Sequence, residues 1–338
     1  MKRGLKFLFG LAVVSALALL LGRRRYLYDG KVVLITGGSR GLGLVLARQL
    51  GSQGAKLMLV ARDGTELARA AEELAARGFS VETMACDVAE EAAASRVVDE
   101  TVRRFGQLDM VINNAGIIVV GPLEQMLAKD YEEAMAVHFW APLRFMTAAL
   151  PYLRKTRGKI VNISSIGGKI AVPHMAPYCA SKFALAGLSD AFRAELARQG
   201  IGVVSVFPGM MRTGSHIHAR FKGQPGKEFA WFALGGATPF TSASAERAAR
   251  EILRGCSRGA AEVVVTVQAR AIVIVAALFP NITGKIIGLV NRLLPASGGM
   301  EQAVPGSVAR GGFPPKGVMA ELDRASEANN ATGGKREP

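Results

Sequence analysis

The chain of 338 residues is long enough for one α/β domain of roughly 250 residues with extensions at both ends. Its formal net charge of +15 raises the question of nucleic acid, but there is no nucleic-acid-binding motif and no basic stripe interleaved with aromatic residues, so we expect no such partner. Three cysteines and four histidines at unrelated spacings predict neither a disulfide framework nor a metal site.

The N-terminal segment Leu5–Gly22 is apolar except for Lys6, and as a helix it is just long enough to cross a bilayer. A secretory signal peptide is the alternative, because Ala16–Ala18 resembles a cleavage site, but this site lies inside the apolar run. The triplet Arg23–Arg25 after the run is typical of a retained anchor. We therefore predict a single-pass membrane anchor and basic linker over residues 1–28, with membrane lipids as partners and the rest of the chain on the cytoplasmic side. Basic residues flank the run at both ends, so their charge does not fix this orientation.

A glycine-rich loop follows the first strand-like run. Lys31–Ile35 has the composition of a buried strand, residues 36–43 have the pattern T-G-x-x-x-G-x-G, and Leu44–Leu50 has the pattern of a helix. These three parts form the phosphate end of a dinucleotide site, because the glycines let the backbone approach a pyrophosphate and the helix N-terminus offers free N–H groups. An ordinary glycine-rich turn is the alternative for this stretch taken alone.

Strand-like and helix-like runs alternate through the rest of the body. This pattern predicts an α/β fold, a doubly wound parallel sheet of the Rossmann type with helices on both faces, in a single domain over residues 29–268. The strand-like runs are Lys56–Ala61, Ser80–Cys86, Asp109–Asn113, Lys159–Ser164, Gly202–Phe207 and Glu262–Thr266. The helix-like runs are Thr65–Arg77, Glu90–Phe105, Tyr131–Leu153, Tyr178–Gln199 and Ala245–Arg254.

The C-terminal part changes character after the last strand-like run. We assign residues 269–295 to a hydrophobic, membrane-associated segment, in which Ala271–Phe279 is too short to span a bilayer and Asn281–Leu294 is amphipathic. The amphipathic helix either packs on the domain or lies in the membrane interface, and we favour the interface. Residues 296–338 are rich in Gly, Ala, Pro and Ser with balanced charge, which predicts a disordered tail.

Polar side chains follow the ends of three predicted strands. Asn113–Gly116 ends one strand, Ser165 follows the next, and the pattern P-G-x-x-x-T over Pro208–Thr213 follows the one after that. Tyr178 and Lys182 are four residues apart, which in a helix places both on one face, one turn apart. Since a doubly wound sheet binds its ligands at the carboxyl ends of its strands, we expect these groups to form one site.

In this order and register, and with the glycine loop, the motifs resemble the short-chain dehydrogenase/reductase family from about Asp29 to Thr266. The resemblance implies that Tyr178 is the general acid/base, that Lys182 lowers its pKa and holds the nicotinamide ribose, and that Ser165 polarises the substrate carbonyl. A phenol with a pKa near 10 does need a nearby cation to act at neutral pH. The resemblance also implies an oxidoreductase with a nicotinamide cofactor, a homodimer or tetramer, and, given the anchor, the membrane-anchored branch that acts on lipophilic substrates.

Two positions bear on the choice of cofactor. Where NAD-preferring members of the family usually carry an acidic residue for the ribose hydroxyls, this chain has Ala61, and Arg40 and Arg62 offer guanidinium groups to a 2′-phosphate, so we predict NADP(H). By the resemblance, the cofactor-binding residues are Thr36, Gly37, Ser39, Arg40, Gly41, Leu42, Gly43, Arg62, Asp87, Val88, Asn114, Ala115, Gly116, Pro208, Gly209 and Thr213, together with Tyr178 and Lys182.

One predicted catalytic position departs from the family. In the helix after Asn113–Gly116 the family usually has an asparagine that completes a tetrad with a bound water, and His138 stands there instead. An imidazole can both donate and accept protons, so His138 either takes over the relay or merely packs. In the second case the protein is a weak enzyme or an inactive NADP-binding scaffold or sensor at the membrane.

The long segment Met210–Thr241 corresponds to the variable lid over the substrate in this family. Its Phe, Trp and Met side chains suit an apolar substrate, although they can equally pack on their own domain or on the membrane. We therefore predict a carbonyl reductase or alcohol dehydrogenase that acts on a lipophilic ketone or secondary alcohol, such as a keto-lipid or a steroid-like compound, with 3-ketosphinganine as one concrete candidate.

Overall fold

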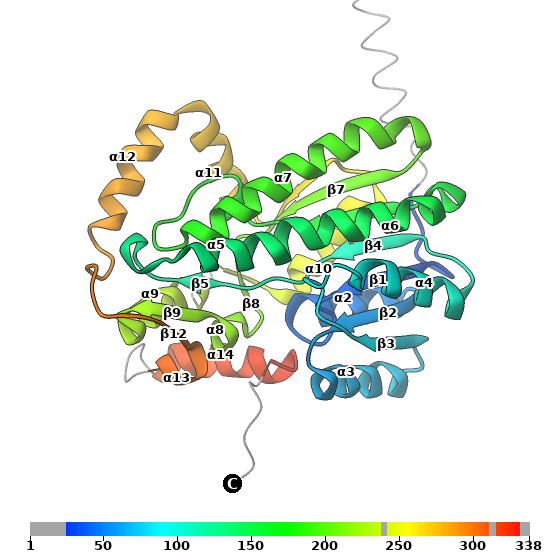
Figure 1. The fold of residues 1–338 in the computed structure, drawn as a ribbon, viewed down its shortest axis with the longest axis horizontal. Helices are drawn as coiled ribbons and strands as arrows, with labels where there is room; N and C mark the ends of the chain where they lie inside the picture. The colour runs from blue at the N-terminus through cyan, green and yellow to red at the C-terminus, as the bar shows by residue number, and fades with distance from the viewer. Residues whose placement is uncertain (1–24, 238–241, 311–315, 332–338) are drawn as a thin grey trace, which may run out of the picture.

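A sheet of seven parallel strands forms the centre of the molecule in the order β11-β7-β6-β4-β1-β2-β3 (Figure 1). The structure is a computed structural model that describes residues 25–237, 242–310 and 316–331. Most of the strands are aliphatic and buried, because helices cover both faces of the sheet. The strands are β1 (Val32–Thr36), β2 (Lys56–Ala61), β3 (Val81–Ala85), β4 (Met110–Asn113), β6 (Lys159–Ile163), β7 (Gly202–Phe207) and β11 (Glu262–Val264).

Two layers of helices enclose this sheet, each with its own hydrophobic cluster. One layer contains α2 (Gly41–Gly51), α3 (Gly64–Ala76) and α10 (Ala245–Ser257). The other contains α4 (Ala93–Phe105), α6 (Ala141–Thr156) and α7 (Ala176–Leu196), with η4 (Ala197–Gln199) continuing α7. The chain winds outward from β1 in one direction and then from β4 in the other, so the predicted doubly wound α/β fold is confirmed. The crevice between β1 and β4 is where such a sheet binds ligands.

A π-helical turn interrupts the long helix that follows β4. The helix begins as α5 (Ala128–Met135), passes through η2 (Ala136–Trp140) and continues as α6. Turns of this kind are rare and are often found at functional sites. Here the turn contains His138, whose side chain is buried against α7 and the segment after β4.

The segment after β7 forms a subdomain with its own small core. Phe221 packs edge-on against Phe229 and Phe232, with ring centroids 5.5 and 5.8 Å apart. The elements of this region and the short helical turns nearby are β5 (Val119–Val120), η1 (Leu123–Gln125), η3 (Ile166–Gly168), β8 (Met210–Arg212), α8 (Ser215–His218), β9 (Arg220–Gly223), α9 (Pro225–Ala237) and β10 (Ser242–Ser244). Most of the aromatic side chains that we expected over a substrate thus pack on their own subdomain.

The prediction of a disordered tail over residues 296–338 is wrong for the described residues. β12 (Met300–Pro305) pairs with β9 in a three-stranded sheet, and it is followed by α13 (Gly306–Ala309) and α14 (Lys316–Ala328). Met319 and Leu322, three residues apart on α14, are buried in the same cluster as the phenylalanines. The prediction failed for two reasons. Two apolar side chains hardly change the mean composition of the tail, and the partner strand of β12 lies about eighty residues earlier in the chain.

Two apolar helices, α11 (Val267–Leu278) and α12 (Pro280–Asn291), project from the body and meet at a bend of 118° (Figure 1). Among the described residues, no single helix is long and apolar enough to cross a membrane, and by length and composition only this bent pair is a candidate. No residue of α12 is buried, so the described part of the chain does not cover its apolar face. The predicted anchor at Leu5–Gly22 lies outside the described residues.

Candidate active site

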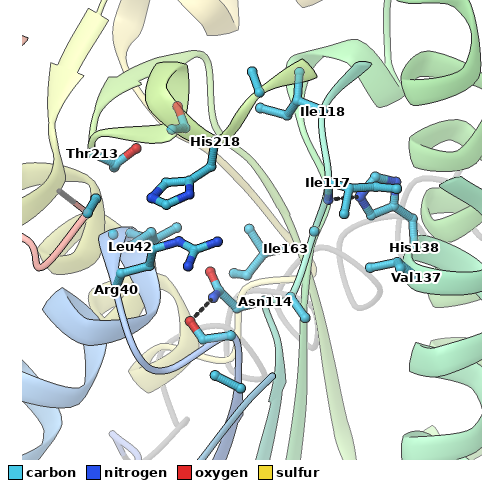
Figure 2. A pocket seen from close by; sticks show the side chains of 18 of the residues that line it. Arg40, Leu42, Asn114, Ile117, Ile118, Val137, His138, Ile163, Thr213 and His218 are labelled. Carbon is cyan, nitrogen blue, oxygen red and sulfur yellow. Dashed lines mark hydrogen bonds between the residues drawn. The ribbon is translucent and has the colours of Figure 1, made fainter. Parts of the chain in front are cut away.

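A cavity of about 450 Å³ opens at the carboxyl ends of the central strands (Figure 2). The structure brings most of the predicted site residues together on its walls, although they are far apart in the chain. These are Gly37, Ser39, Arg40, Gly41, Leu42, Arg62, Asp87, Val88, Asn114, Ala115, Gly116, His138, Ser165, Tyr178, Lys182, Pro208, Gly209 and Thr213. Thr36 and Gly43 do not line the cavity, but they hold the loop that does.

The glycine loop is packed too closely for side chains at Gly37 and Gly43. A Cβ built on Gly37, whose φ is +66°, would lie 2.9 Å from Ala115 Cα, and a Cβ on Gly43 would lie 2.0 Å from the Gly37 carbonyl oxygen. Asn114 Nδ2 donates to the carbonyl oxygens of Thr36 and Gly37 at 3.0 Å, and Thr36 Oγ1 accepts from the Asn114 and Ala115 N–H groups. The loop therefore presents backbone to the cavity, at the N-terminus of α2, which fits the pyrophosphate of a dinucleotide.

Ser165, Tyr178 and Lys182 meet in the same cavity. Tyr178 and Lys182 lie one turn apart on α7, with Lys182 Nζ 5.7 Å from the centre of the Tyr178 ring. Lys182 Nζ donates to the Ile163 carbonyl oxygen at 2.8 Å, which fixes the end of the long side chain. Ser165 Oγ accepts from the Gly167 N–H at 3.1 Å, and the Ser165 side chain is close enough to Tyr178 to affect the pKa of the phenol.

Burial shifts the pKa values of both titratable groups in this trio. It raises the pKa of Tyr178 to about 12, although the neighbouring Ser165 hydroxyl acts in the opposite direction. It lowers the pKa of Lys182 to about 7. Lys182 therefore changes its charge near neutral pH, and its charged form next to the phenol is the one that favours the phenolate.

His138 uses both ring nitrogens in hydrogen bonds with the protein. Nε2 accepts from the Ile117 N–H at 3.1 Å, so Nδ1 carries the proton and donates to Ser181 Oγ at 2.7 Å (Figure 2 shows the first of these bonds). Ser181 Oγ in turn donates to the Tyr178 carbonyl oxygen at 2.8 Å. Burial, and next the charge of Lys182, hold the pKa of His138 well below its usual value. Of the two alternatives for His138, this geometry favours the packing role over a proton relay.

We expect His138→Leu to lower the free energy of unfolding by about 1–3 kcal/mol, because the Ile117 N–H and the Ser181 hydroxyl lose their partner. The kcat should change by less than about threefold. The stability of His138→Asn should lie between those of the wild type and His138→Leu. Chemical denaturation and steady-state kinetics measure both quantities. A large fall in kcat without a loss of stability would contradict the packing role and show that His138 relays protons.

Carboxylates hold the two arginines at the wall of the cavity. Arg40 forms an ion pair with Glu66, which is 4% exposed and also accepts a hydrogen bond from Ser39 Oγ at 3.3 Å. Arg62 lies 3.8 Å from the carboxylate of Asp87. The sequence motifs did not reveal Glu66, whose place in the first turn of α3 was the only available signal.

Other residues line the cavity outside the predicted set of site residues, and apolar side chains are frequent among them. They are Ala61, Asp63, Cys86, Ile117, Ile118, Val137, Ile163, Ser164, Met211, Gly214, Ser215, His218, Ala219 and Ala331. Of the large apolar residues in Met210–Thr241, Met211 is the one that lies among the lining residues. The apolar character of the site thus comes mainly from the segment after β4, the end of β6 and η2, and not from the predicted lid.

Sequence comparisons agree with this geometry. A profile of the family described as short chain dehydrogenase matches residues 31–222. A Mycobacterium tuberculosis protein, named provisionally as the oxidoreductase SadH, is 36% identical over 275 residues, which cover 80% of this chain and 96% of that protein. The 11-beta-hydroxysteroid dehydrogenase-like protein 4A of Arabidopsis thaliana is 39% identical over 194 residues, or 55% of this chain and 63% of that protein. A Streptomyces violaceoruber protein, named provisionally as ketoacyl reductase 1 of the granaticin polyketide synthase, is 38% identical over 185 residues, or 54% of this chain and 68% of that protein.

Proposed function

This chain belongs to the short-chain dehydrogenase/reductase family of oxidoreductases, which use nicotinamide dinucleotides, and we propose that it is an NADP(H)-dependent carbonyl reductase or alcohol dehydrogenase acting on a lipophilic ketone or secondary alcohol. The observation that carries this proposal is the meeting of Ser165, Tyr178 and Lys182 in a cavity that also contains the glycine loop. A hydroxyl donor, an acid and a cation held together can donate to an oxygen on which negative charge grows and can protonate it.

The trio can carry out the proton chemistry of carbonyl reduction. A nicotinamide dinucleotide held by the glycine loop and Lys182 would supply the hydride for the carbonyl carbon. The Ser165 hydroxyl donates a hydrogen bond to the carbonyl oxygen, where negative charge grows. Tyr178 gives its phenolic proton to the same oxygen, which completes the alcohol and leaves a phenolate that the Lys182 cation stabilises until solvent returns the proton. Alcohol oxidation runs through the same groups in reverse.

Three observations support the finer parts of the proposal. Arg40 and Arg62 at the wall of the cavity, with Ala61 in place of an acidic residue, favour a cofactor with a 2′-phosphate. Apolar side chains such as Ile117 and Ile118 favour an apolar substrate. The names of two relatives, a hydroxysteroid dehydrogenase-like protein and a ketoacyl reductase, refer to substrates of this kind.

A substrate panel tests the proposal. Purified protein is incubated with NADPH or NADH and with short-chain, steroid and long-chain keto-lipid ketones, and the loss of absorbance at the nicotinamide band is followed. Turnover with NADPH that increases with the apolar size of the ketone is the expected result. Binding of NADPH without turnover of any ketone or alcohol would instead identify a cofactor-binding scaffold.

The proposal also places the protein on a membrane, with its catalytic body on the cytoplasmic side. Two segments carry this part: the apolar run Leu5–Gly22, and the bent pair α11 and α12, whose apolar side chains are exposed. An amphipathic helix of this kind lies in the interface and binds more strongly to anionic lipids when basic residues are near it. Held in this way, the cavity would receive a lipophilic substrate from the bilayer.

We expect a protein that lacks residues 1–24 to remain partly bound to anionic vesicles and to be released fully when Ile286→Glu and Leu293→Glu are added. Both side chains are exposed, at 54% and 81%, so these changes should not disturb the core. Ala68→Glu with Ala75→Glu, at exposed positions of α3, is the matched control and should not release the protein. Complete solubility of the truncated protein without further changes would contradict the second contact.

A further inference from the structure

The C-terminal end of α14 lies against the glycine loop, far away in the sequence (Figure 1). Asn330 Nδ2 donates to the Ser39 carbonyl oxygen at 2.8 Å and to the Glu66 carbonyl oxygen at 2.9 Å. Its Oδ1 accepts from Arg69 Nε at 3.1 Å. Both donors of this amide and one of its acceptor positions are therefore in use, and the amide ties the glycine loop to the first turn of α3.

Neighbouring residues hold this end of α14 in place. The Asn329 carbonyl oxygen accepts from the N–H of Gly41, the first residue of α2, whose N-cap has no side-chain hydrogen bond of its own. Arg48 on α2 donates to Asn329 Oδ1 and to the Ala328 carbonyl oxygen. We call residues 329–331 the C-terminal clasp. It supplies a cap to the helix whose N-terminus faces the phosphate end of the cavity.

The backbone of the clasp suits its position. Asn330 has a φ of +55°, a left-handed conformation that asparagine tolerates better than most residues, and the Ala331 N–H closes the helix by donating to the Ser326 carbonyl oxygen at 2.8 Å. Ala331 then lines the cavity together with Ser39 and Arg40. The clasp is thus part of the wall at the loop end of the cavity. Its amide holds the carbonyl groups of Ser39, next to Arg40, and of Glu66, the ion-pair partner of Arg40.

We propose that Asn330 is a positioning residue of the dinucleotide site, which fixes Ser39 relative to Glu66 and so holds Arg40 and the N-terminus of α2 ready for the phosphates. The inference rests on the proposed function only in requiring that a dinucleotide binds, and neither the ketone nor the trio around Tyr178 has a part in it. Without the amide, the loop and α3 keep the contacts of Ser39 and Arg40 with the Glu66 side chain but lose the link between their backbones, and binding must order the loop at a cost in affinity.

The test compares the full chain with Asn330→Gly. Glycine favours the left-handed conformation, so this variant removes the amide without straining the end of α14. The dissociation constant of the preferred dinucleotide, measured by titration calorimetry, should rise about tenfold, which two lost hydrogen bonds of ordinary strength would account for. In the unliganded protein, amide hydrogen exchange over residues 37–44 should become faster. The kcat at saturating dinucleotide should stay within about twofold of the wild type.

Two further variants make the result decisive. Asn330→Asp keeps the shape and the tolerance for positive φ but puts a carboxylate against two carbonyl oxygens, so it should bind the dinucleotide at least as weakly as Asn330→Gly. Glu327→Gln, at an exposed position of α14, is the matched control and should behave as the wild type. If Asn330→Gly matches the wild type in both affinity and loop exchange, the contact is only packing and the proposal is overturned. If affinity falls as expected but none of these proteins reduces a ketone, the role of Asn330 is supported and the proposed reaction is wrong.

Discussion

Tyr178→Phe is expected to lower the kcat for ketone reduction about a thousandfold, because it removes the proton that completes the alcohol and leaves the rest of the cavity unchanged. The dissociation constant of NADPH should stay within about twofold, since the ring remains beside Lys182 and the glycine loop is untouched. Steady-state kinetics and calorimetric titration of NADPH measure the two quantities on the same preparation.

Tyr152→Phe is the matched control for this change. The Tyr152 hydroxyl donates to Asp99 at the surface, away from the cavity, so losing it should leave kcat unaltered. If Tyr178→Phe retains more than about a tenth of the wild-type kcat, another group supplies the proton, and the assignment of the trio is wrong.

Arg40→Ala combined with Arg62→Ala should weaken NADPH binding by roughly a hundredfold or more and NADH binding by much less. Each charge-assisted hydrogen bond to a 2′-phosphate contributes about 1.5–3 kcal/mol, and NADH has no such phosphate. The structure adds a second reason, because the double change leaves the carboxylates of Glu66 and Asp87 without their cations at the wall of the cavity. A negatively charged ligand should then be repelled where it was attracted.

Dissociation constants of the two dinucleotides, measured in parallel, decide this prediction. Arg103→Ala, on the exposed side of α4 where the guanidinium binds Glu100, is the control for loss of positive charge and should change neither constant. An equal loss of affinity for NADPH and NADH would mean that the arginines maintain the shape of the loop and do not bind the 2′-phosphate.

The features that the sequence predicted well are local ones. A strand such as Lys56–Ala61 is apolar without interruption from Leu57 to its end, because both faces of a parallel sheet are buried, and the predicted and observed bounds coincide. Tyr178 and Lys182 fell on one face of a helix because spacing alone decides that. Once the strands are parallel, the residues at their ends must gather at one edge, so the cavity followed from the topology.

The features that the sequence did not predict depend on partners far away in the chain. The composition of the tail gave no sign that Asn330 would bind Ser39 and Glu66, because a few buried contacts in a polar segment hardly change its mean hydropathy. The fate of His138 was undecided for a similar reason. Its two hydrogen-bond partners lie on other elements, and only the folded chain shows that both of its nitrogens are in use.

The burial that places Lys182 beside the phenol also works against the folded state. The pKa of this lysine falls from 10.5 to about 7 on folding, so between those values the unfolded chain keeps a proton that the folded chain has released. The free energy of unfolding therefore gains a contribution that increases with pH across this interval, and below pH 7 the folded chain bears the whole penalty of a buried charge. An apolar side chain in its place would remove that penalty and, with it, the cation beside the phenol. At this position an apolar residue would increase the free energy of unfolding, whereas catalysis needs a lysine. The lysine found there favours catalysis at a cost in stability.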